Sequence, residues 1–322
     1  MQHKVFVTEP IHEVAQAMLA GNVAIDVGEL SLPREEIKRR VADATVILNK
    51  TDPIKFDREL IDAAPQLVHI ARHGSGYDNV DVAYATSKGI SVSYVSGANT
   101  VAIAEYTVGL MLLATRKLVD AVEKSRAGNP PRSQFLGIEA CGKTFGIVGL
   151  GAIGREVVKR VRAFGMDVLA YHPRPQGKDF TGVETTLVPF DELLARSDVV
   201  SIHIPLNAET RGLFGRRELL LMKPTAYLLN LARGGIVDET ALAEVLRARR
   251  LAGAVLDVLA DEPVKATEPL LACPNCIVLP HIAAMTTETQ ARIALNAAEN
   301  VLAFCRGDRP RYLANPEVWP VA

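Results

Sequence analysis

The sequence lacks an excess of charge of either sign. Its 322 residues include 36 Lys and Arg against 37 Asp and Glu, which gives a formal net charge of -1. Proteins that bind nucleic acids or anionic membrane surfaces neutralise them with surplus cationic side chains. We therefore expect neither of these to be a main partner.

Long apolar runs are also missing. The most apolar stretch, residues 101–114, is interrupted by Glu105 and Gly109, whereas a membrane span needs about 18 or more apolar residues. The first apolar run near the N-terminus stops at Glu9 and Pro10, so the apolar core and cleavage site of a secretory signal are missing. These features predict no membrane span and a cytoplasmic location.

Cysteine is scarce, with four residues in the chain. Cys273 and Cys276 form a C-x-x-C pair, but a zinc site needs two further ligands and a redox pair is expected at a helix N-terminus. We interpret the pair as part of a loop that enters a strand at residues 277–279. Cys141 and Cys305 have no partner at metal-ligand spacing, so no metal site is predicted.

The sequence does contain a regular alternation of strand-like and helix-like segments, and its length suggests roughly two domains. In the first hundred residues, strands are expected at 4–7, 23–27, 45–48, 67–71 and 90–95, and helices at 11–20, 33–42, 58–64 and 82–87. This rhythm predicts a parallel sheet covered by helices.

A long helix is expected from residue 100 to about 125, followed by a loop rich in glycine and proline and by a second alternating series. Its strands are expected at 144–150, 167–171, 199–204, 226–231, 252–258 and 277–281. They are nearly continuous apolar runs, as strands covered on both faces require. The fold class is therefore α/β, with two doubly wound parallel sheets. The final helix, 287–306, has no strand partner, so we expect one domain from 1–99 with 287–322 and another from 100–286.

A glycine turn opens the second series. Gly149, Gly151 and Gly154 form G-x-G-x-x-G between an apolar strand and an amphipathic helix, which is the setting that a dinucleotide requires. We expect Gly149 to allow the tight turn, Gly151 to let the backbone approach a pyrophosphate, and Gly154 to let helix and strand pack closely.

The next strand ends without the acidic residue that accepts hydrogen bonds from an adenosine ribose. His172 stands in that place, and Arg174 follows two residues later. Arg174 suits a 2′-phosphate, which tips the expectation toward NADP. In the other interpretation Arg174 stacks on adenine or reaches solvent, and the cofactor is NAD.

Residues for carbonyl chemistry follow three strands. Arg233, Glu262 and His281 each come after an apolar run, at the end of the sheet where open α/β folds bind ligands. Tyr84 and Lys88 offer a different pattern, Y-x-x-x-K, but they precede the glycine turn instead of following it. We interpret that pattern as a coincidence on a surface helix.

These motifs, together with the loop 72–81 and the segment 315–319, resemble those of the D-isomer-specific 2-hydroxyacid dehydrogenases over nearly the whole chain. The resemblance implies a flavodoxin-like substrate domain and an NAD(P)-binding Rossmann domain. It also implies a homodimer formed through the helix after Asn99. The expected substrate is a small 2-keto or D-2-hydroxy acid of the glyoxylate, hydroxypyruvate or phosphoglycerate type.

The resemblance also assigns roles to individual residues. Arg233, Glu262 and His281 are the expected catalytic residues, while Ser75 and Gly76 offer backbone amides to the substrate carboxylate. Lys50 either recognises a phosphate or second carboxylate or is simply solvated. The expected cofactor contacts are Gly149, Gly151, Ala152, Ile153, Gly154, His172, Arg174, Pro205, Thr210, Ala232 and Asp257.

The three catalytic roles are chemically coherent. His281 would donate a proton to the keto oxygen as hydride arrives, Glu262 would hold the other ring nitrogen, and Arg233 would bind the substrate carboxylate with its planar fork. Ala283 and Ala284 stand where the family commonly has Gly-Gly or Gly-Ser after the Ile that follows its histidine, and they add methyl groups near the nicotinamide pocket. The alternative function is a cofactor-sensing, corepressor-like binding protein of the same fold.

Overall fold

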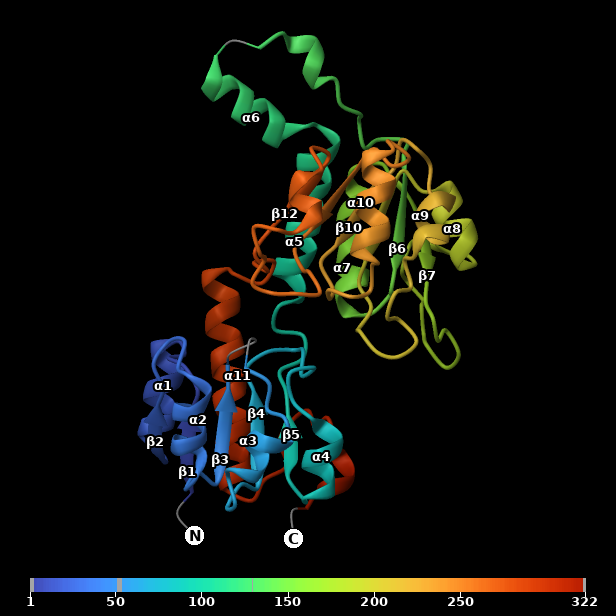
Figure 1. Ribbon diagram of the computed structural model, residues 1–322. Coiled ribbons are helices and arrows are strands. Elements are labelled where there is room, and N and C mark those ends of the chain that lie inside the picture. The colour runs from blue at the N-terminus through green and yellow to red at the C-terminus, as the bar shows by residue number, and fades with distance from the viewer. Residues whose placement is uncertain (1–2, 51–53, 129, 321–322) are drawn as a thin grey trace. The chain divides into compact units, whose positions relative to one another are not determined.

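The computed structural model describes residues 3–50, 54–128 and 130–320. The chain forms two compact units, Met1–Asn99 with Met285–Ala322 (unit 1) and Thr100–Ala284 (unit 2). Each unit is built on one sheet whose strand pairs are all parallel (Figure 1). The expected α/β fold with two parallel sheets is confirmed.

The sheet of unit 1 has the strand order β2-β1-β3-β4-β5, which is the flavodoxin-like order. Its strands are β1 (Lys4–Val7), β2 (Ala24–Val27), β3 (Val46–Asn49), β4 (His69–Arg72) and β5 (Ser91–Ser93). Helices α1 (Glu13–Ala20) and α11 (Thr287–Cys305) bury their apolar residues on one face. Helices α2 (Arg34–Val41), α3 (Arg58–Asp62) and α4 (Val82–Ser87) cover the other. Helix α11, which was predicted to have no strand partner of its own, thus covers one face of the first sheet (Figure 1).

The sheet of unit 2 has the order β12-β11-β10-β9-β6-β7-β8. Its strands are β6 (Thr144–Val148), β7 (Asp167–Tyr171), β8 (Thr186–Leu187), β9 (Val199–Ile202), β10 (Tyr227–Asn230), β11 (Gly253–Leu256) and β12 (Cys276–Val278). The strand order reverses at β6, which lies between β7 and β9, and such a switch point is where doubly wound sheets bind ligands. The two-residue strand β8 was not predicted, because it carries no apolar run.

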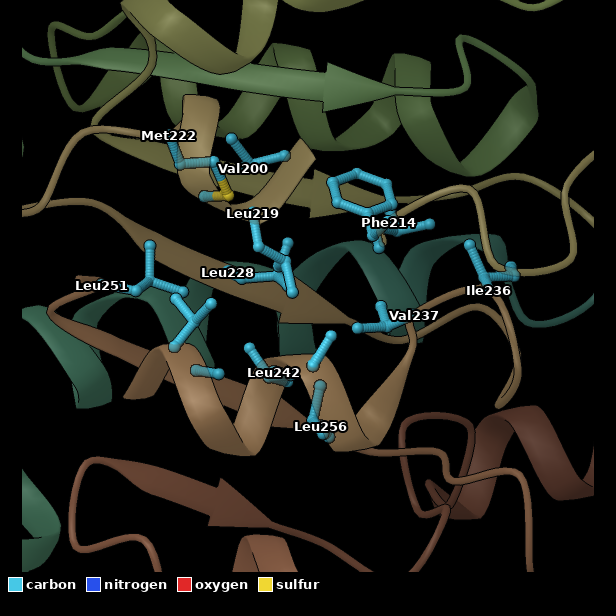
Figure 2. Packing of buried hydrophobic residues seen from close by; sticks show 14 of the residues in the cluster. Val200, Phe214, Leu219, Met222, Leu228, Ile236, Val237, Leu242, Leu251 and Leu256 are labelled. Carbon is cyan, nitrogen blue, oxygen red and sulfur yellow. The ribbon is translucent and has the colours of Figure 1, made fainter. Parts of the chain in front are cut away.

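Two layers of helices enclose this second sheet. Helices α5 (Thr100–Thr115) and α7 (Ala152–Ala163) pack on one face, and α8 (Phe190–Arg196), α9 (Arg216–Leu221) and α10 (Glu239–Arg247) pack on the other. Figure 2 shows the second of these layers, where Leu242 of α10 packs near Leu228 of β10 and Leu256 of β11. All three side chains are essentially buried. Truncating such a leucine costs about 2–5 kcal/mol of stability, so this core firmly fixes the ends of β10 and β11.

The expected single helix over residues 100–125 is wrong in one respect. The chain forms α5 and then a separate helix α6 (Leu118–Ala127), with Lys117 in the left-handed region at φ 52°. The carbonyl of Thr115 accepts the N–H of Ile138 at 3.0 Å, so a segment more than twenty residues later takes the place of the next helical turn. The sequence near residue 116 gives no sign of this contact. Helix α6 buries none of its residues, and in Figure 1 it projects from its unit together with the 3-10 helix η1 (Arg132–Phe135).

Two further short 3-10 helices, η2 (Pro269–Ala272) and η3 (Pro316–Val318), complete the elements. None of the helices in the described part of the chain combines the length and apolarity needed to span a membrane.

Candidate active site

The ends of the strands in unit 2 lie in register. Tyr171, Val148, Ile202, Asn230, Leu256 and Val278 are successive partners across β7, β6, β9, β10, β11 and β12. Because each is the last residue of its strand, the loops that follow them all leave from one end of the sheet. The glycine turn, His172, Arg233, Glu262 and His281 come from these loops. The sheet therefore gathers most of the predicted site residues at its carboxyl end.

The three glycines of the turn have three different environments. A Cβ on Gly149 would lie 2.5 Å from the carbonyl oxygen of His203, and its φ is +105°. A Cβ on Gly154 would lie 2.2 Å from the carbonyl oxygen of Gly149. Both distances are shorter than real contacts, so these positions need glycine for the fold itself. A Cβ on Gly151, by contrast, would meet nothing within 4 Å.

The open space over Gly151 fits a phosphate group. Gly151 is the N-cap of α7, and no side chain caps that helix end. Its first backbone amides, at Ala152 and Ile153, therefore begin a helix whose N-terminal dipole attracts anions. The turn combines tight backbone packing on two sides with space on the third, and these residues suit the pyrophosphate of a dinucleotide.

The loop after β7 carries His172 and Arg174. The Nδ1 atom of His172 accepts the backbone N–H of Arg174 at 3.0 Å, and burial lowers the pKa of His172. Arg174 donates to Glu209 through Nη2 at 2.7 Å and through Nε at 3.2 Å. Both partners are largely exposed, at 65% and 63%. No local pattern in the sequence signals this ion pair, because the two residues are 35 positions apart.

Glu209 belongs to the loop after β9, which contains two other predicted cofactor contacts. The hydroxyl of Thr210 donates to the carbonyl of Pro205 at 2.7 Å and accepts the N–H of Asn207 at 2.8 Å. Thr210 is buried while Pro205 is exposed. The hydrogen bonds of Thr210 thus fix the shape of the loop from inside, and Pro205 lies exposed on the surface of the loop. Burial lowers the pKa of the neighbouring His203 to about 4, so its ring is neutral near pH 7.

His281 and Glu262 form a hydrogen-bonded pair, which becomes an ion pair when the imidazole is protonated. Nδ1 of His281 lies 2.7 Å from Oε2 of Glu262, and the side chains are 37% and 33% exposed. The other carboxylate oxygen of Glu262, Oε1, accepts the backbone N–H of Leu259 at 3.0 Å. A carboxylate anchored on one side to backbone and on the other to an imidazole fixes the orientation of the ring. The predicted partnership of these two residues is present in the structure.

The electrostatics of Glu262 favour its ionised form. Burial alone raises its pKa, but the hydrogen bond to His281, the charge of His281, the Leu259 amide and the charge of Arg233 together bring the pKa below its usual range. A lowered pKa means that the carboxylate stays ionised as the pH falls, until the folded-state pKa is reached. Glu262 therefore remains a charged partner for the histidine throughout the neutral range.

Asp257 holds the backbone that follows His281. Its two carboxylate oxygens accept the N–H groups of Ile282 at 3.0 Å and of Ala283 at 2.8 Å. His281 itself adopts a positive φ of 56°, which is uncommon for a side chain with a Cβ. Desolvation raises the pKa of the buried Asp257. The family resemblance predicts Asp257 beside the nicotinamide. In the structure its carboxylate holds the backbone directly after His281, where the positive φ makes the turn strained.

Asn230 shapes the loop of Arg233, although no sequence motif marks it. Its side-chain oxygen accepts the N–H of Ala232 at 3.1 Å and its amide donates to the carbonyl of Arg233 at 3.0 Å. Nη1 of Arg233 donates to the carbonyl of Ala232 at 2.7 Å. Asn230 is buried at the end of an apolar strand. A polar residue in that position is the sequence feature that could have identified it as a residue that shapes the site.

The predicted substrate residues Lys50, Ser75 and Gly76 belong to unit 1. Arg72 connects the two loops that carry them, because its guanidinium donates to the carbonyls of Asn49 and Lys50 after β3 and of His73 and Gly76 after β4, at 2.9–3.2 Å. The hydroxyl of Ser75 accepts from Asn99 at 3.3 Å. Nζ of Lys50 donates to the carbonyl of Pro10 at 2.5 Å, which agrees with a structural role for this lysine.

The Y-x-x-x-K pattern has a surface role. The hydroxyl of Tyr84 donates to Asp62 at 2.8 Å, and Nζ of Lys88 pairs with the same carboxylate at 2.8 Å. Both residues lie on or directly beside α4 of unit 1, so they belong to a different unit from the glycine turn.

All four cysteines are free, and Cys273 and Cys276 lie at the end of η2 and the start of β12. Among the residues that the structure describes, no group of three or more His, Cys, Asp or Glu side chains is arranged to hold a metal ion.

A switch-point sheet with a phosphate turn and a histidine–carboxylate pair at the same end defines a dinucleotide-binding protein equipped for acid–base chemistry. Comparison with known families gives the particular class. Residues 108–283 match the model for the NAD binding domain of D-isomer specific 2-hydroxyacid dehydrogenases. The chain therefore belongs to the D-isomer-specific 2-hydroxyacid dehydrogenase family.

Individual relatives agree with this assignment. A glyoxylate reductase of Korarchaeum cryptofilum is 39% identical over 99% of this chain and 97% of its own length. A D-3-phosphoglycerate dehydrogenase of Archaeoglobus fulgidus is 41% identical over 98% of this chain, and the chain spans about three fifths (60%) of that relative's length. The crystal structure of a glyoxylate reductase from Paecilomyes thermophila is similar with a TM-score of 0.86 and 32% identity, over 98% of this chain and 99% of that one.

Proposed function

We propose that this chain is an oxidoreductase that transfers a hydride between a nicotinamide dinucleotide and a small 2-keto or D-2-hydroxy acid. The observation that carries the proposal is the 2.7 Å pair of His281 and Glu262, at the same end of the sheet as the phosphate turn. Family membership supports it. A pair of this kind supplies a proton at neutral pH, which a carbonyl needs as it becomes an alcohol.

The chain's own residues divide the work of this reaction. A reduced nicotinamide, when bound at the phosphate turn, would supply the hydride for the carbonyl carbon. His281 donates its proton to the carbonyl oxygen and takes it back in the oxidative direction. Because Glu262 holds Nδ1, we assign the transferred proton to Nε2. Arg233 holds the substrate carboxylate, for which its planar fork is suited.

We propose glyoxylate or hydroxypyruvate as the substrate type. The similarity to the glyoxylate reductases of K. cryptofilum and P. thermophila supports this type, and the 41% identity to the D-3-phosphoglycerate dehydrogenase of A. fulgidus makes phosphohydroxypyruvate the substrate to test against it. Rates with NADH and NADPH on glyoxylate, hydroxypyruvate, pyruvate and phosphohydroxypyruvate test this directly. Turnover that is fastest on phosphohydroxypyruvate would contradict the substrate assignment, and no turnover on any acid would contradict the function.

The alternative of a cofactor-sensing binding protein, similar to a corepressor, is less well supported. A protein that only senses a cofactor has no need of a proton donor, yet the chain keeps Arg233, Glu262 and His281 and orders the last two in a pair. Cofactor-dependent association without turnover of any 2-keto acid would favour this alternative.

For the cofactor we propose NADP over NAD. His172 in place of an acid removes the usual ribose partner, and Arg174 offers a cation for a 2′-phosphate. Glu209 already pairs with Arg174, so a phosphate must compete with that carboxylate. We accordingly expect a modest preference, with both cofactors used. The ratio of kcat/KM for NADPH and NADH measures it.

We also propose that the protein is a homodimer and cytoplasmic. Helix α6 buries no residue, and its Leu118 and Val122 are 48% and 51% exposed. A second copy of the chain would cover such a helix. Light scattering of the wild type and of Val122→Asp tests the dimer: we expect a dimer that the aspartate weakens, and a wild-type monomer at micromolar concentration would contradict the proposal.

The cytoplasmic location is supported by the cysteines, because four free thiols are typical of a reducing compartment.

A further inference from the structure

The turn between Asp257 and Glu262 is held by a residue that the catalytic scheme does not include. Glu239, the first residue of α10, accepts the backbone N–H of Ala260 through Oε1 at 2.7 Å. The preceding N–H, that of Leu259, is held by Glu262. Two consecutive amides of this turn are thus bound by two different carboxylates, one of which belongs to the pair with His281.

The same turn is packed against the loop of Arg233. A Cβ on Gly234 would lie 2.0 Å from the carbonyl carbon and oxygen of Leu259 and 2.3 Å from the nitrogen of Ala260. The peptide group between Leu259 and Ala260 therefore lies directly against the backbone of the residue after Arg233. Any shift of this peptide would move both Arg233 and Glu262.

Capping of the helix does not explain the position of Glu239. Asp238 is the N-cap of α10, and its carboxylate accepts the N–H of Ala241 at 3.0 Å. The side chain of Glu239 instead extends from the helix to the neighbouring turn, where it accepts the N–H of Ala260. Its surroundings are unfavourable for a carboxylate, since burial and the charges of Glu268, Asp261 and Glu262 raise its pKa while the Ala260 amide lowers it. A half-buried acid among other acids is costly unless the contact that it makes is needed.

We propose that Glu239 is a positioning residue for the catalytic pair. By binding the amide of Ala260 it fixes the turn from which Glu262 reaches Nδ1 of His281, and through Gly234 it keeps this turn in place against Arg233. The proposal rests on the proposed function, because it gives the pair the acid–base role described above.

Three variants test the proposal. Glu239→Ala removes the acceptor, Glu239→Gln keeps an oxygen that can accept the Ala260 N–H, and Glu244→Ala is the matched control on the same helix, where an exposed glutamate pairs with Arg216. Displacement of a catalytic group by about 1 Å can cost about a hundredfold in rate. We expect Glu239→Ala to lower kcat by about ten- to a hundredfold while cofactor affinity stays within about threefold. Glu239→Gln and Glu244→Ala should stay close to wild type.

A second measurement needs no substrate. The NMR titration of His281, assigned with His281→Ala, reports how well the neighbouring carboxylates of Glu262 and Asp257 stabilise its charged form. We expect Glu239→Ala to lower the titration midpoint and Glu239→Gln to leave it near that of the wild type. Equal shifts in both variants would show an effect of charge alone and overturn the proposal.

An unchanged kcat in Glu239→Ala would overturn the proposal as well. So would a loss of kcat of the same size in Glu239→Gln, since the oxygen acceptor would then not be what matters. If the wild type turned over no 2-keto acid, the proposed function would fail, and the titration would still decide whether Glu239 positions the pair.

Discussion

The phosphate turn and the catalytic loops lie at the same end of one sheet, but they are built in opposite ways. The turn of Gly149–Gly154 depends on close backbone contacts, two of which leave no room for a Cβ. The loops that carry Arg233 and His281 are held by buried side chains, Asn230 and Asp257, whose hydrogen bonds end on backbone groups. A pyrophosphate does not change during the reaction, so backbone groups alone can bind it. A site that moves a proton needs side chains that are themselves held in place.

The largest effect is expected at the catalytic loops. His281→Ala removes the proton donor, and we expect kcat to fall by at least about a thousandfold. Cofactor binding, followed by the fluorescence of NADH or NADPH, should remain within a few-fold of wild type because the phosphate turn is untouched. A variant that kept more than a tenth of the wild-type rate would show that another group supplies the proton.

Two Gly→Ala substitutions separate the structural role of the phosphate turn from its role in cofactor binding. Gly154→Ala places a methyl group against the carbonyl of Gly149, so we expect it to lose about 2–3 kcal/mol of stability. Gly151→Ala meets no protein atom and should leave the melting temperature unchanged, while weakening cofactor binding by about tenfold or more. Thermal unfolding and cofactor titration measure both properties. Normal cofactor affinity in Gly151→Ala would argue that the pyrophosphate does not lie over this glycine.

The pH dependence of activity tests the pair itself. Glu262→Gln removes the negative charge beside Nδ1 of His281, so the imidazolium is less stabilised and loses its proton at a lower pH. The pH above which keto-acid reduction declines should fall by about one unit, and kcat at pH 7 should fall with it. Asp261→Asn, which changes an exposed neighbour paired with Lys265, is the control and should leave the profile in place.

The smallest effect is expected at the loop after β7. Arg174→Ala should lower kcat/KM for NADPH relative to NADH by about three- to tenfold, because the guanidinium is exposed and already shared with Glu209. Glu209→Gln should change the same ratio in the opposite direction. Equal effects on the two cofactors would leave the phosphate interpretation without support.

Predictions from the sequence were accurate where the signal is local. The strands 4–7 and 167–171 and the helix 82–87 were expected with the bounds that they have, because the apolar runs of the strands are continuous and a turn signal follows each of the three elements. The long helix after Asn99 was placed correctly at its start but not at its end, since the contact of Ile138 with Thr115 ends it. Arg174 was predicted to face a phosphate, adenine or solvent, and its pairing with Glu209 could not be predicted from residues so far apart.

The sequence by itself determined the glycine turn, the order of the strands along the chain and the residue types Arg233, Glu262 and His281. These depend on the spacing of apolar residues and on backbone freedom, which act over a few residues. Only the tertiary structure decided which groups hold them: Asp257 on the amides after His281, Asn230 around Arg233, and Glu239 on the Ala260 amide. A hydrogen bond between a buried carboxylate and a distant amide depends on where two chain segments meet in space. That meeting is fixed by the packing of the whole sheet.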